Sequence, residues 1–310
     1  MRLVSVRLPL RPLALASLVL NALLVVTGGA VRLTGSGLGC PTWPRCTDAS
    51  YTTTAAMGVH GAIEFGNRLL GVVIGLVALA TFIAALLEKP RRRGQARLSF
   101  ALGLGVVAQG VVGGITVLTG LNPWIVGAHF VISMVMTAGA YVLWKRTAEP
   151  DAPRLPLVPG PLRTLARVTA VVSAAVILVG VVVTGSGPHA GDAETPRNGF
   201  DPTTISQVHA DLVFLLIGLS VALWFALRAA DAPPATVRAA GVLVLVELGQ
   251  GLIGFVQYFT HLPVLLVGAH MLGAVFVWLA TLAAVRALSA SPAPAPATPA
   301  AEPVPATSAA

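Results

Sequence analysis

Eight separate apolar stretches, most of them about 20 residues or longer, run through this chain of 310 residues. A helix of roughly 20 apolar residues is long enough to cross the hydrocarbon core of a bilayer. The stretches lie at residues 12–32, 58–87, 98–119, 124–145, 164–184, 206–228, 236–259 and 263–287. They predict an all-α integral membrane protein with eight transmembrane helices.

The composition excludes a water-soluble enzyme. Only 10% of the residues are charged, whereas a soluble domain carries about 25%. Two cysteines are too few for a disulfide scaffold or a cysteine-built metal cluster. The net charge of +8 does not indicate nucleic-acid binding, because the basic residues lie in short loops between apolar runs and not on one folded face.

The basic residues also predict the orientation of the spans. Sixteen lysines and arginines flank one set of span ends, whereas the opposite set has only Arg32, Arg45 and Arg197. Since Lys and Arg accumulate in cytoplasmic loops, we predict that both termini are cytoplasmic. The remaining basic residue, Arg68, lies inside the second span.

The two halves of the chain resemble each other. Residues Gln109–His129 align without a gap with Gln250–His270, and Thr34–Gly37 recurs as Thr184–Gly187. We therefore predict two tandem four-helix bundles. Because each bundle has an even number of spans, both start on the same side of the membrane, so the two form an internal pseudo-two-fold repeat about an axis along the membrane normal.

This repeat divides the chain into four regions. We expect an N-terminal bundle at residues 1–147, a proline-rich cytoplasmic linker at 148–162 and a C-terminal bundle at 163–288. Residues 289–310 are rich in Pro and Ala without a periodic apolar face, and predict a disordered cytoplasmic tail.

Four histidines lie at a similar depth near the outer ends of the even-numbered spans: His60, His129, His209 and His270. One ionisable residue inside a membrane can be structural, but four at matching depths in two pairs indicate a functional site. Facing imidazoles in a four-helix bundle are typical axial ligands of haem iron. Zinc fits less well, because it usually takes three or four protein ligands.

Small residues precede two of these histidines. Gly127 and Ala128 come before His129, and Gly268 and Ala269 come before His270. We therefore expect a backbone thin enough there to admit the flat haem ring.

The second span carries further polar residues beside His60. His60, Glu64 and Asn67 share one helical face, and Arg68 is one turn from Glu64. Glu64 is an acid–base candidate or, alternatively, an ion-pair partner of Arg68. The four histidines, one glutamate and one arginine are the informative polar residues that we identify inside the spans. The sixth span has no counterpart of Glu64, so we expect one site for chemistry and one for electron transfer or structure.

The outer loops hold the remaining candidates. Cys40 and Cys46 lie in the first outer loop, where an oxidising compartment permits either a redox-responsive or a structural disulfide. His189 and Asp192 lie in the third outer loop, where His189 is a candidate for the mouth of the second site, and His261 reads as a surface residue.

Taken together, these features resemble the haem A synthase family over nearly the whole chain up to about residue 288. The resemblance rests on the eight spans in a repeated arrangement, the paired histidines and three segments, which are Gly29–Pro41, Glu64–Arg68 and Thr184–His189. It implies an oxidoreductase that converts a methyl group of haem O to a formyl group through hydroxylated intermediates, with oxygen from water.

The family's site residues carry over onto this sequence position by position. The resemblance implies that His209 and His270 bind a haem b cofactor, that His129 binds the substrate haem O and that Glu64 is the catalytic carboxylate. Cys40 and Cys46 match the outer-loop cysteine pair of the family.

This chain departs from the family pattern at two places. Asn67 stands where the family often has a histidine, so we expect either His60 to take over as the iron ligand or the substrate iron to be held by another group, with Asn67 and Arg68 also at the substrate haem. The third outer loop has no cysteine pair.

The resemblance also implies partners and a location. The partners are haem O as substrate, haem O synthase and cytochrome oxidase assembly factors, an unidentified electron acceptor such as a quinone, and membrane lipid. No nucleic acid is expected. The location is a bacterial cell membrane. A homo-oligomer stays open.

Two alternatives stay open beside the synthase. A quinol-linked electron carrier with two b haems would use the same histidines. A repeat-type transporter predicts broken helices and polar groups at the bilayer midplane.

Overall fold

The computed structural model describes residues 9–291, and within them eight helices are long and apolar enough to cross a membrane. This confirms the predicted all-α membrane protein with eight spans. The helices are α1 (Leu10–Leu33), α2 (Gly58–Leu87), α3 (Arg93–Leu118), α4 (Pro123–Thr147), α5 (Gly160–Ser186), α6 (Pro202–Ala229), α7 (Pro234–Phe259) and α8 (Val264–Arg286). Short elements complete the fold: the 3₁₀ turn η1 (Ala55–Met57) and the strands β1 (Leu155–Pro156) and β2 (Ser289–Ala290).

Local sequence signals set the helix starts. α4 begins at a proline after Asn122, whose side chain accepts a hydrogen bond from the Trp124 amide at 3.0 Å. α6 likewise begins at a proline after Asp201, whose carboxylate accepts from the Thr204 amide at 2.7 Å. Proline at the first helical position and Asn or Asp before it are favoured N-terminal residues. The helices extend past the apolar stretches at some ends, because hydropathy marks only the part inside the hydrocarbon.

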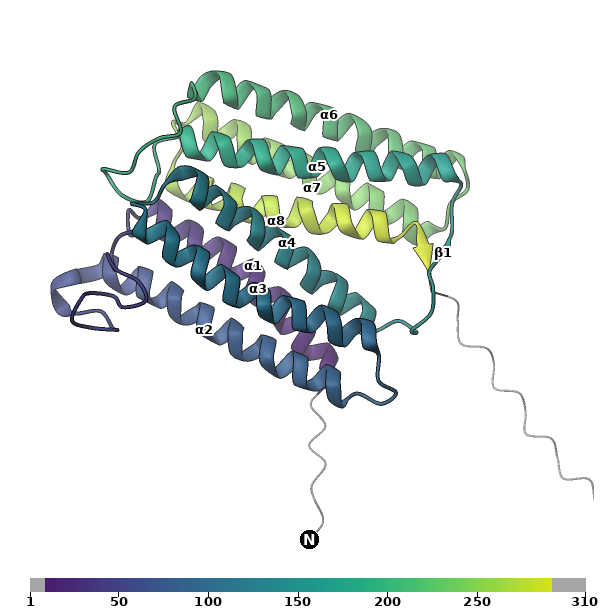
Figure 1. Ribbon diagram of the computed structural model, residues 1–310. Coiled ribbons are helices and arrows are strands. Elements are labelled where there is room, and N and C mark those ends of the chain that lie inside the picture. The colour runs from purple at the N-terminus through teal and green to yellow at the C-terminus, as the bar shows by residue number, and fades with distance from the viewer. Residues whose placement is uncertain (1–8, 292–310) are drawn as a thin grey trace, which may run out of the picture.

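The helices form two four-membered bundles that lie side by side (Figure 1). In the first bundle α1 packs on α2 and α4, and α3 packs on α2 and α4; α5, α6, α7 and α8 repeat this arrangement. Between the bundles, α4 contacts α5 and α8, and α8 contacts α1. One end of the bundles carries the two longest connections (residues 34–57 and 187–201) together with the short turns 119–122 and 260–263, and we call it the long-loop end. The other end carries the connections 88–92, 148–159 and 230–233, and we call it the short-loop end.

The glycines of the repeated Gly-Ala-His motif serve the packing between bundles. A Cβ atom at Gly127 of α4 would lie 2.7 Å from Val181 of α5, and one at Gly268 of α8 would lie 3.6 Å from Leu33 of α1. The prediction that these two glycines make room for a haem ring was wrong. They face the other half of the chain because they lie on the side of α4 and α8 away from the bundle interior.

The shared core lies where α1, α4 and α8 meet. Val25, Met134 and Val275 are buried together there, and the indole Nε1 of Trp278 donates to the Met134 carbonyl at 3.2 Å. The two bundles therefore form one continuous packed unit.

Arg32 joins the halves at the long-loop end. From the last turn of α1, its Nε donates to the His189 carbonyl at 2.5 Å and its Nη2 donates to the Thr184 carbonyl at 2.6 Å. The Gly37 amide adds a backbone bond to the Gly191 carbonyl at 2.8 Å.

Glu149 joins the halves at the short-loop end. Its carboxylate accepts from Arg154 at 2.6 Å and also pairs with Arg286 at the end of α8. Arg154 in turn donates to the Arg286 carbonyl at 2.7 Å and to Ser289. This cluster holds β1 against β2.

Ordered structure therefore continues past residue 288, the predicted end of the second bundle. Ser289 and Ala290, which we assigned to a disordered tail, form β2 and pair with β1. The rest of that tail, residues 292–310, lies outside the described residues.

We predict that the Glu149 cluster stabilises the fold in a pH-dependent way. Burial raises the pKa of the Glu149 carboxyl, but the hydrogen bond from Arg154 and the charges of Arg286 and Arg154 outweigh it and hold the pKa below its ordinary value of 4.5. The stabilisation is therefore complete at neutral pH, begins to fade near pH 4.5 and disappears below the folded-state pKa. Glu149→Gln should cost roughly 1–2 kcal/mol at neutral pH.

Thermal unfolding in detergent at several pH values measures this effect. The difference in unfolding temperature between wild type and Glu149→Gln should shrink as the pH falls. The variant Glu194→Gln, changed at an exposed position, should have the unfolding temperature of the wild type at each pH. A difference that stays constant with pH would contradict the role of the charge.

Candidate functional site

The clearest candidate site is the histidine pair of the second bundle. His209 of α6 and His270 of α8 lie near the long-loop end, half-buried, with ring centroids 6.4 Å apart and ring planes at 70°. The Nδ1 atoms of both rings are buried without a hydrogen-bond partner. Two imidazoles that each bind one metal ion at about 2 Å have centroids roughly 6 Å apart, so the pair is spaced to hold a metal between its rings.

Glycines leave room beside these rings. A Cβ atom at Gly180 of α5 would lie 3.0 Å from the His209 ring, and one at Gly254 of α7 would lie 3.2 Å from the His270 ring. Two imidazoles with bare backbone beside them suit a metal inside a flat macrocycle. Within residues 9–291 no group of three or more His, Cys, Asp and Glu side chains could hold a metal ion, which does not suit zinc.

Glutamines position the repeated histidines in both bundles. The Gln250 Nε2 donates to the His270 carbonyl at 2.8 Å, and the Gln109 Nε2 donates to the His129 carbonyl at 3.0 Å. In the first bundle Ser133 also contacts Gln109 and donates to the same carbonyl. These hydrogen bonds from the glutamine side chains fix how α7 lies against α8, and how α3 lies against α4, next to the imidazoles.

The first bundle differs from the second at the ring pair. His129 of α4 lies against Gly113 of α3, where a Cβ would be 3.4 Å from the ring, and its Nδ1 has no partner. His60 is exposed at the start of α2, and its Nδ1 shares a hydrogen bond of 2.9 Å with the Ser36 hydroxyl. Among the described residues no ring contact joins His60 to His129, in contrast to the pair in the second bundle.

Asn67 faces the interior between α1 and α2. Its Oδ1 accepts from the Thr27 hydroxyl at 2.8 Å, and its Nδ2 is 4.0 Å from the position of a Cβ at Gly28. Asn67 therefore points into the helix bundle, whereas His60, the predicted iron ligand, is exposed.

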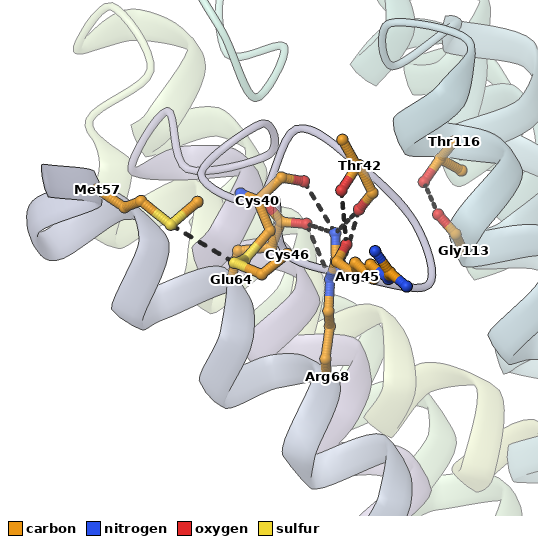
Figure 2. Close-up of polar contacts among 9 residues, drawn as sticks. All are labelled: Cys40, Thr42, Arg45, Cys46, Met57, Glu64, Arg68, Gly113 and Thr116. Atoms are coloured by element: carbon orange, nitrogen blue, oxygen red, sulfur yellow. Dashed lines mark hydrogen bonds and ion pairs between the residues drawn. A yellow bond between two sulfur atoms is a disulfide. The ribbon is translucent and has the colours of Figure 1, made fainter. Parts of the chain in front are cut away.

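Glu64 and Arg68 form a buried ion pair under the first outer loop (Figure 2). Glu64 is only 6% exposed; its Oε1 accepts from Arg68 Nη2 at 2.5 Å and its Oε2 accepts from the Cys40 amide at 2.7 Å. Arg68 also donates to the carbonyl oxygens of Cys40, Thr42 and Arg45. These bonds engage every N–H of its guanidinium group, so Arg68 holds the loop on α2.

The disulfide between Cys40 and Cys46 is formed, as predicted, and both residues are fully buried. The loop that it closes lies directly on the helices. A Cβ atom at Gly39 would lie under 3.0 Å from the His60 carbonyl oxygen at the start of α2, so only glycine permits this approach. Trp43 covers Gly114 of α3 in the same way. The loop thus caps the long-loop end of the first bundle.

The other loop residues connect segments. The His189 Nε2 forms a hydrogen bond of 2.9 Å with the Leu262 carbonyl, while its own carbonyl accepts from Arg32. Asp192 lines a shallow hollow together with His60, and His261 is exposed, as predicted.

The sequence reasoning missed one polar residue inside the spans. Glu247 lies in the middle of α7 and is 2% exposed. A lone carboxyl group within the seventh apolar stretch was the signal that could have identified it.

The fold defines a multi-pass membrane protein built from two repeated four-helix bundles, with an imidazole pair in the second bundle. Residues 11–282 match the COX15-CtaA family, described as cytochrome oxidase assembly protein. The chain belongs to this family.

Individual relatives agree with this assignment, and those compared here are named Heme A synthase. The protein of Methylorubrum extorquens is 29% identical over 93% of this chain and 88% of the relative. The proteins of Methylobacterium radiotolerans and Alkalihalophilus pseudofirmus are 31% and 30% identical, over 54% and 39% of this chain. In these two cases the chain spans only 53% and 40% of the relative's length.

We predict that Arg68 stabilises the protein through Glu64. Arg68→Gln leaves the Glu64 carboxylate buried without its cation and should cost roughly 3 kcal/mol. Thermal unfolding in detergent measures the change, and Arg45→Gln, in the same loop but exposed, is the matched control.

The double variant Glu64→Gln with Arg68→Gln should be more stable than Arg68→Gln alone, because no charge is left unpaired. Equal unfolding temperatures for Arg68→Gln and wild type would refute the structural role of the pair.

Proposed function

We propose that this protein is a haem A synthase that oxidises a methyl group of haem O to a formyl group. The observation that carries the proposal is the family match over residues 11–282, in a chain whose repeated bundles hold unequal sites. The second bundle has a ring pair, whereas the first has His129 beside a buried carboxylate on α2. One bundle thus suits a resident cofactor and the other suits a substrate.

The reaction needs water as the oxygen source and an electron acceptor. Methyl plus one water gives formyl, four electrons and four protons, through hydroxylated intermediates. In our proposal the electrons leave through the second bundle to an acceptor such as a quinone.

His209 and His270 would hold a haem b, which supplies one-electron redox chemistry when bound. The support for this is their 6.4 Å ring spacing, their unpartnered Nδ1 atoms and the glycines beside both rings. Gln250 fixes the backbone position of His270.

In the first bundle, His129 would bind the iron of haem O together with His60 or another group, and Asn67 and Arg68 would contact the substrate haem. Asn67 lies between α1 and α2, whereas His60 is exposed and its Nδ1 is hydrogen-bonded to Ser36, which leaves the His60 Nε2 as its free ligand atom. Glu64 lies on the same face of α2 as Asn67. Its carboxylate would stabilise positive charge that develops at the methyl carbon or take a proton from it. The Arg68 guanidinium positions that carboxylate.

The predicted location and partners complete the proposal. Apart from Arg2 and Arg7, which lie outside the described residues, the sixteen basic residues flank the short-loop end, which supports cytoplasmic termini in a bacterial cell membrane. Haem O synthase, as the source of the substrate, and cytochrome oxidase assembly factors, as acceptors of the product, are the partners that this activity requires.

We predict that Gly254→Val lowers the haem content of the purified protein. A larger side chain would press on the His270 ring, whereas at Gly251 of the same helix there is open space. Absorption spectra after purification should show a loss of haem in Gly254→Val and normal content in Gly251→Val. Full haem content in both variants would contradict the assignment of the second site.

We predict that Glu64→Gln retains haem but loses the formation of haem A by about 100-fold or more, since it cannot supply charge or accept a proton. Extraction and chromatography of haems from cells that supply haem O measure the products, with Glu194→Gln as the control. An active Glu64→Gln variant would leave Glu64 with only its structural role. Absence of haem A and of hydroxylated products from wild-type cells would instead favour the di-haem electron carrier, and absence of any haem would favour transport.

A further inference from the structure

Glu247 is a buried carboxyl group that the proposed reaction does not use. It lies 13 residues from the start of α7, about 20 Å along the helix axis and near the middle of the span. Its Oε1 accepts from the Ser220 hydroxyl of α6 at 2.8 Å, and its Oε2 is buried without a hydrogen-bond partner.

Among the described residues, no cation forms an ion pair with this carboxyl group. Ion pairs within residues 9–291 involve Glu64 and Glu149 but not Glu247. Helices α6 and α8 pack against α7, and the titratable or charged groups on these three helices are His209, Asp211, Arg228, Arg238, Tyr258, His270 and Arg286. Arg286 is bound to Glu149, Arg228 lies over the Trp224 ring and Asp211 accepts from Gln207. Arg238 and Tyr258 are exposed, so the histidine pair and whatever it binds are the remaining candidates for a counter-charge.

The repeat shows that Glu247 belongs to the second bundle alone. The offset of 141 that aligns His270 with His129 places Val106 at the position of Glu247. The offset of 149 that aligns His209 with His60 places Gly71 at the position of Ser220. The carboxyl group and its hydroxyl partner are thus both absent from the bundle that we assign to the substrate.

Glu247 lies on the face of α7 that serves His270. Gln250 and Gly254 are three and seven residues further along, so all three residues share one side of the helix. Gln250 binds the His270 backbone and Gly254 lies beside its ring. The carboxyl group is therefore about 10 Å along the helix from the ring level, a distance over which charges in a low-dielectric interior interact strongly.

We propose that Glu247 is the proton acceptor that balances the charge of the second-bundle site when that site is reduced. This inference rests on the proposed function, which provides the electrons and the resident haem. When the site gains one electron, the Glu247 carboxylate takes up one proton from water and forms an O–H bond at Oε2. When the electron passes to the acceptor, the proton is released. Ser220 holds Oε1 in both states.

Redox titration of the purified, haem-loaded protein over a range of pH tests the proposal. In the wild type the midpoint potential of the second-bundle haem should fall as the pH rises, by up to about 59 mV for each tenfold change in proton concentration. In Glu247→Gln the potential should become independent of pH over that window. Asp211→Asn, which removes the other carboxyl group of α6 and α7, should keep the wild-type slope.

Two further measurements separate a proton-binding role from a packing role. Ser220→Ala should shift the pH range over which the midpoint potential depends on pH. The dependence itself should remain, because the carboxyl group remains. Infrared difference spectra of reduced minus oxidised protein should show a protonated carboxyl band that shifts in D₂O and is missing in Glu247→Gln. Glu247→Asp should retain such a band, which keeps the test open if the Gln variant folds poorly.

The outcomes distinguish this inference from the proposed function. A protein that binds haem with the same pH slope in wild type and Glu247→Gln overturns the role of Glu247 and leaves the synthase proposal standing. Loss of the slope in Asp211→Asn assigns the proton to the other carboxyl group and also overturns it. A wild-type protein with no haem in its second bundle refutes both.

Discussion

The structure depends on the cost of leaving a polar group unsatisfied in hydrocarbon. Most polar side chains within the helices meet this cost with a nearby partner, as Arg68 does with Glu64 and Gln250 does with the His270 backbone. Three imidazole Nδ1 atoms and one Glu247 oxygen have none among the described residues. Ionisable groups of this kind inside a membrane are expensive, and they are the groups to which we assign the proposed chemistry.

One scaffold carries two different environments. In both bundles a glycine lies against the histidine ring and a glutamine side chain donates a hydrogen bond to the histidine carbonyl, so the imidazoles of His129 and His270 are positioned alike. What differs lies around them. The first bundle has a disulfide-closed loop anchored on Glu64, and the second has His209 within ring distance and a carboxyl group at mid-depth. Divergence has therefore acted on the neighbours of a conserved backbone geometry.

Much of the fold follows from the sequence, because hydropathy and the offset of 141 require no knowledge of side-chain contacts. The eight spans and the facing of His209 and His270 were predictable on that basis, and the cysteine bridge followed from the place of both cysteines in one outer loop. The direction in which each side chain faces around its helix axis could not be predicted in this way. Gly127 and Gly268 adjoin histidines in the sequence but face the other bundle, and Asn67 points inward although His60 has the better ligand chemistry. Glu247 was missed because a single charge hardly lowers the hydropathy of its span.

The contacts between the bundles have an evolutionary consequence. Gly127 of α4 lies against Val181 of α5, and Gly268 of α8 lies against Leu33 of α1, so the last helix of each bundle packs on the first helix of the other bundle. Such reciprocal pairing is the hallmark of an isologous interface between identical subunits. A single four-helix ancestor could thus have assembled as a symmetric homodimer. Since each half has an even number of spans, its two ends emerge on one membrane face, and a short linker sufficed to fuse the gene copies without inverting either subunit.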